Sequence, residues 1–162
     1  MLLFYRLCQK LKEKIMLRRP SEIDYLESYY IANYTAAIYY KHGVLSTKKP
    51  FLKRLFKSLY NHKKTLKDDL DKHILEAKDQ EYLDILIKKC KKEILQMQRK
   101  LSETPNLKSG RICIEMEKQF IKQLHHTLSN LTDGNLRNTC LAHKHTSKPL
   151  QKQLILVNKY LI

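Results

Sequence analysis

Residues 83–101 read LDILIKKCKKEILQMQRKL, and their apolar positions recur with the spacing of a helix that packs against other helices. These positions are Leu83, Ile87, Cys90, Ile94, Met97 and Leu101, in alternating steps of four and three residues. On an α-helix such positions form one continuous stripe. The stretch therefore predicts a helix over about 80–102 with one buried face, a strict heptad seam.

The stretch before it predicts another long helix, over 50–78, and Pro50 suits its first turn. Its apolar positions, again three or four residues apart, are Leu52, Phe56, Leu59, Leu66 and Leu70, with Lys63 in the missing step. The stripe changes phase after Ala77, where Asp79 can cap a new helix. We therefore predict a long antiparallel helical hairpin at about 50–102. A single bent helix is the alternative.

Two helices are expected ahead of this hairpin. Residues 2–18 carry an apolar stripe on one face and a basic face opposite, which is an amphipathic pattern. The stripe is Phe4, Leu7, Leu11 and Ile15, and the basic residues are Arg6, Lys10, Lys12 and Lys14. The next helix begins at a capping-box-like Ser21 and Asp24, and Gly43 is expected to end it.

The remainder of the chain predicts one long helix and one short one. An apolar stripe runs from about Gly110 to Leu131, where Asp133 and Gly134 follow. Residues 135–147 show no helical period and are expected to form a loop. Pro149 then suits the start of a terminal helix over 149–162, with a short strand as the alternative.

Composition and length give the fold class. Three Gly and four Pro in 162 residues are too few for the frequent turns of an all-β fold. The length suits one domain with its own core. We predict a single all-α domain, a helical bundle of five to six helices. Its parts are an N-terminal helix pair over 1–47, the long hairpin over 48–102 and C-terminal helices over 103–162.

The net charge of +16 suggests an acidic ligand, either nucleic acid, an acidic protein or an anionic membrane surface. Residues 1–20 carry +5 and residues 118–162 carry +6, and the predicted hairpin holds two further positive blocks, +7 over 48–64 and +5 over 88–101. A closed hairpin would place these blocks side by side. The predicted polyanion-binding residues are Lys48, Lys49, Lys53, Arg54, Lys57, Lys63, Lys64, Lys88, Lys89, Lys91 and Lys92. Compositional drift is the alternative, because 25 of the 32 cationic residues are Lys and only 7 are Arg.

Tyrosines suggest a second kind of contact. Six of the chain's ten tyrosines fall in residues 21–43, on several faces of the expected helix. Tyrosine suits wet interfaces because its ring is apolar and its hydroxyl is polar. Tyr29, Tyr30 and Tyr40 are therefore candidate partner-binding residues, and burial in a central helix is the alternative. The heptad seam is a further candidate surface, for homo-oligomerisation.

Catalytic and metal-binding motifs are missing from the sequence. There is no phosphate-binding glycine loop, nucleophile elbow or zinc-protease motif. Cys140, His143 and His145 fit no standard zinc spacing, so neither a metal nor another cofactor is expected. The sequence therefore predicts a non-enzymatic, basic helical protein that binds a polyanion, with nucleic acid as the leading candidate. The alternative to polyanion binding is a protein–protein adaptor or effector-like module, or a peripheral membrane binder.

The expected location is intracellular, soluble or peripheral to a membrane. The apolar start of the chain is interrupted by Arg6, which argues against a secretory signal. No apolar run has the roughly 18 residues that a membrane span needs. Four widely spaced cysteines, Cys8, Cys90, Cys113 and Cys140, suggest reduced thiols.

Overall fold

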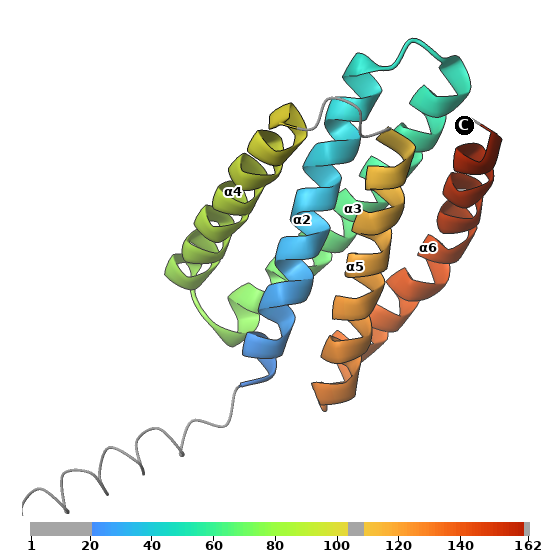
Figure 1. Ribbon diagram of the computed structural model, residues 1–162. Helices are drawn as coiled ribbons and strands as arrows, with labels where there is room; N and C mark the ends of the chain where they lie inside the picture. Colours follow the sequence, from blue (N-terminus) through green and yellow to red (C-terminus); the bar gives the residue numbers. More distant parts are fainter. Residues whose placement is uncertain (1–20, 104–108, 161–162) are drawn as a thin grey trace, which may run out of the picture.

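The computed structural model describes residues 21–103 and 109–160, which form an all-α bundle (Figure 1). Its helices are α2 (Glu22–Ser46), α3 (Pro50–Ala77), α4 (Gln80–Glu103), α5 (Ser109–Asn130) and α6 (Gly134–Tyr160). No strand occurs in these two ranges. The all-α prediction is confirmed. The helix predicted over 2–18 lies outside the described residues.

Four of the helices form a ring in the order α2, α3, α6, α5. Each of these helices packs against the next, and α5 packs back against α2. The fifth helix, α4, lies outside the ring, mainly along α2. Figure 1 shows α2 in front, with α4 and α5 on its two sides and α3 behind it. We call this arrangement the four-helix ring.

Helices α3 and α4 are two separate helices rather than one bent helix. The Tyr82 backbone N–H donates to Asp79 Oδ1 at 2.8 Å, so Asp79 caps α4 as its side chain predicts. The two helices run in opposite directions (Figure 1). However, α4 packs mainly on α2 and touches α3 only slightly. A long hairpin packed along its length is therefore not confirmed.

The prediction that Gly43 ends the second helix is wrong. Helix α2 continues to Ser46, and no described glycine has a positive φ. Gly43 instead allows α2 and α3 to approach closely. A Cβ at this position would lie 2.8 Å from Phe56 Cδ2, which is well inside van der Waals contact.

The prediction of a loop over 135–147 is also wrong, and so is the helix start at Pro149. Helix α6 runs from Gly134 through Pro149 to Tyr160. Its buried side chains keep a helical spacing, but several of them are polar, which hid the period. They include Leu136, Cys140, His143, Ser147 and Leu154. The helix begins at a cap that the sequence shows, since the Leu136 N–H donates to Asp133 Oδ1 at 2.7 Å.

The core consists of two clusters of buried side chains. The first contains Leu26, Tyr29 and Tyr30 of α2 together with residues of α3, α4, α5 and α6, including Leu83 and Cys90 of the heptad seam. The second joins Tyr40 of α2 to residues of α3, α5 and α6, and no buried α4 residue belongs to it. Leu83 and Cys90 are thus used inside this chain. They are not available to a second copy in this fold.

Candidate polyanion-binding surface

Helices α3 and α6 pack antiparallel through polar side chains. His62 pairs with Thr146 at 2.9 Å, Asp69 with His143 at 3.0 Å and His73 with Thr139 at 3.0 Å. Residue numbers thus rise along α3 as they fall along α6. The first half of α3 therefore lies beside the second half of α6, and these halves share the second core cluster.

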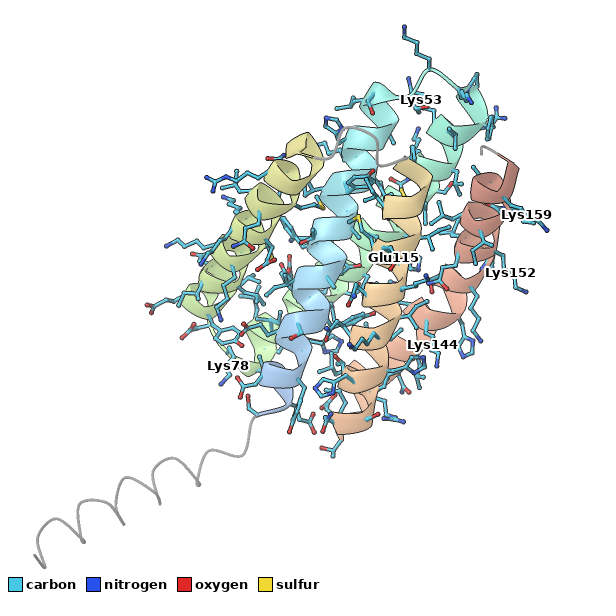
Figure 2. The ribbon with its side chains drawn as sticks, in the orientation of Figure 1. Lys53, Lys78, Glu115, Lys144, Lys152 and Lys159 are labelled. Carbon is cyan, nitrogen blue, oxygen red and sulfur yellow. The ribbon has the colours of Figure 1, made fainter. Side chains whose placement is uncertain are left out.

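This packing places two lysine stripes on neighbouring helices. Lys53, Lys57 and Lys64 of α3 are exposed, in steps of four and seven residues. Lys148, Lys152 and Lys159 of α6 are exposed in the same two steps. Steps of four and seven fall on one face of an α-helix. Figure 2 shows Lys53, Lys152 and Lys159 extending outward from the bundle.

Neither half-helix contains an acidic residue. Residues 48–67 of α3 and its approach, and all of α6, lack Asp and Glu in the sequence. We define the α3–α6 basic surface as Lys48, Lys49, Lys53, Arg54, Lys57, Lys64, Lys144, Lys148, Lys152 and Lys159. Lys144 is half-buried and the other members are exposed. Within these two stretches no Asp or Glu reduces the positive potential. Acidic residues begin at the edge of the surface, because Asp68 lies one helical turn after Lys64 and Lys144 follows His143, which pairs with Asp69.

The lysines of α4 do not join this surface. Lys88, Lys89, Lys91 and Lys92 are exposed, and Lys89 Nζ lies 2.6 Å from Glu27 Oε1 on α2. Because α4 lies along α2 and the basic half of α3 packs with α2, α5 and α6, the fold does not bring the two predicted charge blocks together. Helix α6 takes the place that α4 was expected to have. The block charge of residues 118–162 was the only signal of this in the sequence.

Lys63 is not part of the surface, so its predicted contact with a polyanion is wrong. Its side chain is 0% exposed, and Nζ lies 3.1 Å from Glu117 Oε1 of α5. The same Nζ lies 3.1 Å from the centroid of the Phe120 ring, which adds a cation–π contact. Burial fits the position of Lys63 in the apolar stripe of α3.

Glu117 is held by neutral donors as well as by Lys63. The Tyr40 hydroxyl donates to its carboxylate at 2.7 Å and the Gln151 amide at 3.1 Å. Burial alone would raise the pKa of Glu117, but the Lys63 ammonium and these hydrogen bonds outweigh burial and keep its pKa below the usual value. Burial lowers the pKa of Lys63. The network joins α2, α3, α5 and α6 at one point.

The three predicted partner-binding tyrosines are core residues. Tyr29, Tyr30 and Tyr40 are all 0% exposed, so the fold does not offer them to a partner. The Tyr30 hydroxyl donates to Asp71 Oδ1 at 2.7 Å, and that of Tyr40 donates to Glu117. Helix α2 is central, and tyrosines on several faces meet different neighbours. The alternative given by the sequence, a buried central helix, is the correct one.

A histidine pair lies between α3 and α6. The His62 and His143 rings are 5.5 Å apart and meet edge to face, and His143 Nε2 lies 3.0 Å from Asp69 Oδ2. Burial, followed by the nearby Lys63 and His143, lowers the pKa of His62 to about 4. His62 is thus kept neutral at physiological pH. Its contacts join two helices of the ring.

Other kinds of site find no support in the described part of the chain. Within it, no group of three or more His, Cys, Asp or Glu side chains could hold a metal ion. In residues 21–103 and 109–160, no helix is both long enough and apolar enough to cross a membrane. No family model, curated protein or solved structure matches the chain.

Proposed function

We propose that this protein is a non-enzymatic binding protein that engages nucleic acid through the α3–α6 basic surface. The observation that carries the proposal is the pair of lysine stripes on neighbouring, antiparallel half-helices that lack acidic residues. A ligand with many regularly spaced negative charges can neutralise such a surface at several points at once. Nucleic acid is such a ligand.

The dimensions of the surface suit a phosphate backbone. At about 1.5 Å per residue, steps of four and seven residues separate lysines by roughly 6 and 10 Å along each stripe. Packed helices lie about 8–10 Å apart, so the second stripe adds contacts beside the first. Duplex DNA carries about one charge per 1.7 Å of its axis. Several phosphates can therefore be contacted together.

The residue types favour binding that ignores base sequence. Nine of the ten surface members are lysines, which meet phosphates as point charges. Arg54 is the single member with the planar fork that reads guanine by two hydrogen bonds. Phosphate contacts position a protein on nucleic acid but carry little sequence information. We therefore expect similar affinity for DNA and RNA of different sequences.

The test is fluorescence anisotropy with labelled DNA and RNA over a salt series, using a matched pair of variants. Lys148→Gln with Lys152→Gln removes two charges from the α3–α6 basic surface. Lys88→Gln with Lys92→Gln removes two exposed charges at the same spacing from α4. The plot of log affinity against log salt has a negative slope. The first variant should make this slope shallower by about 2, since two phosphate contacts are lost. The second should leave it nearly unchanged.

Two results would count against this function. Undetectable binding of the unmodified chain at low salt would remove nucleic acid as the ligand, because counterion release favours binding most strongly there. Equal losses in the two variants would show that net charge matters and the proposed surface does not. Circular dichroism of both variants provides the control for folding.

An anionic membrane surface is the second candidate, and one observation favours it. Ile155 and Leu156 are 56% and 54% exposed on α6, beside Lys152 and Lys159 in the sequence. Apolar side chains among lysines are typical of helices that lie in the headgroup region. Co-sedimentation with phosphatidylserine vesicles tests this. Tighter binding to vesicles than to nucleic acid at the same salt would replace the first function by this one. An acidic protein is a third candidate ligand, because it is also negatively charged.

A further inference from the structure

A groove of about 630 Å³ lies over α2 between α4 and α5. The two flanking helices do not contact each other, so the groove separates them. Figure 1 shows α2 exposed to the viewer between α4 and α5. Its apolar lining is Ile31, Ala32, Met97, Ile112 and Met116.

The groove leaves a face of α2 without a helix against it. Other faces of α2 are buried against α3, α4 and α5. On the groove side Ile31, Ala32 and Thr35 are only half-buried. The Thr35 hydroxyl is buried and finds no partner among the described residues. Apolar side chains of a helix are normally covered by a neighbouring element, so half-buried Ile31 and Ala32 mark a face of α2 that lacks a packing partner.

The chain itself contains a segment of suitable length and pattern. Residues 2–18 carry the apolar stripe Phe4, Leu7, Leu11 and Ile15, and residues 1–20 have a net charge of +5. As a helix, 17 residues span roughly 25 Å. The α2 residues that line the groove, 28–35, lie roughly 10–21 Å along α2 from Ser21. Residues 19–21 are a sufficient connection, because helix–helix links of two to eight residues are common.

We propose that residues 2–18 form a helix antiparallel to α2 and occupy this groove. The apolar stripe then packs on Ile31 and Ala32, between Met97 of α4 and Met116 of α5. The tether to α2 raises the local concentration of the segment at the groove, which favours this occupant over a separate chain. The proposal does not depend on the ligand of the α3–α6 basic surface.

The antiparallel orientation fixes which side chains face each wall. If Arg18 is level with Glu22, then Cys8 is level with Ala32. The right-handed turn of the helix places Cys8 toward α5, where Gln119 lines the groove. It places Lys10 toward α4, where Glu93 lines the groove and is exposed. Opposite charges therefore meet on the α4 side.

A disulfide-trapping experiment on the full chain tests this placement. Gln119→Cys introduces a thiol that faces the groove, and Lys118→Cys introduces one at the next position of α5, outside the groove lining. The buried thiols of Cys90, Cys113 and Cys140 should not compete, because burial raises the pKa of each to about 12. Mild oxidation, non-reducing gels and peptide mass spectrometry identify any bridge to Cys8.

We expect an intramolecular disulfide to Cys8 in the Gln119→Cys variant and no such disulfide in the Lys118→Cys variant. Adding Leu11→Asp, which places a charge in the apolar stripe, should abolish the bridge. Adding Lys12→Asp, outside the stripe, should leave it in place. Equal bridging at the two α5 positions, or none at either, would overturn the proposal. A bridge between two chains would assign the groove to a second copy instead.

Discussion

At the scale of single residues, Lys63 shows how a charge can belong to a core. It fills a step of the apolar stripe of α3, and its ammonium meets both Glu117 and the face of Phe120. Two buried charges taken out of water are costly unless each is well paired. Here the remaining lone pairs of the carboxylate accept from Tyr40 and Gln151. The pair thus fixes which faces of four helices meet.

Lys63→Met should destabilise the fold by about 3–5 kcal/mol, because it leaves the buried Glu117 carboxylate without its counter-charge. Urea denaturation followed by circular dichroism measures this loss. The double variant Lys63→Met with Glu117→Gln should recover much of it, since a neutral amide can still accept from Tyr40. A loss under 1 kcal/mol in the single variant would contradict the role of the pair.

At the scale of helices, Gly43 illustrates close packing of α2 on α3. A glycine inside a helix usually costs up to about 1 kcal/mol relative to alanine. Gly43→Ala should instead destabilise the protein, by about 1–3 kcal/mol, since the added methyl group meets the Phe56 ring at 2.8 Å. Thermal melting against Gly134→Ala provides the comparison, because nothing lies within 4 Å of a Cβ at Gly134. Stabilisation by Gly43→Ala would disprove the close approach.

Helix boundaries could be predicted from the local sequence where the buried face of the helix is apolar. The start of α3 at Pro50 and the Asp79 cap of α4 agree with the structure, because both depend on neighbouring residues alone. The first half of helix α6 escaped prediction because His143 and Ser147 occupy buried positions of its stripe. They are accepted there because α3 offers polar partners, such as Asp69 for His143. Only the tertiary fold shows those partners.

At the scale of the whole molecule, the sequence predicted six of the ten members of the candidate surface. Six α3 and pre-α3 members, from Lys48 to Lys64, were identified from charge alone. The α6 members were missed because their position beside α3 depends on the order of helices around the ring. Lys63 was wrongly included because its neighbours in sequence do not reveal Glu117, which is 54 residues away.

Stability of the whole bundle should fall on mild acidification. The pKa of His62 is lowered from 6.5 to about 4, chiefly by burial, with Lys63 and His143 adding to this and Glu117 opposing it. The unfolded chain therefore takes up this proton more readily than the folded chain. Stability is retained above about pH 6.5 and is lost as the pH falls toward 4.

Urea midpoints at neutral pH and at the lower end of that window check this dependence, with His62→Gln as the control. The variant should lose less stability over the same interval, because glutamine has no proton to gain. The pKa of Asp69 is lowered, first of all by its hydrogen bond to His143. Protonation of Asp69 therefore reduces stability only in a separate range, below about pH 3.8. An identical pH dependence in the variant would show that His62 is not the responsible group.

The order of helices around the ring also governs when the protein can begin to work during its synthesis. Helix α6 closes the ring between α5 and α3, yet it is translated after all the other described helices. A ribosome-bound chain that still lacks α6 has the lysines of α3 but neither the second stripe nor Thr146 and His143, the α6 partners of His62 and Asp69. Since domains generally fold as units, the fold and its basic surface should form together. A nascent chain would then gain the proposed affinity for polyanions late, in one step.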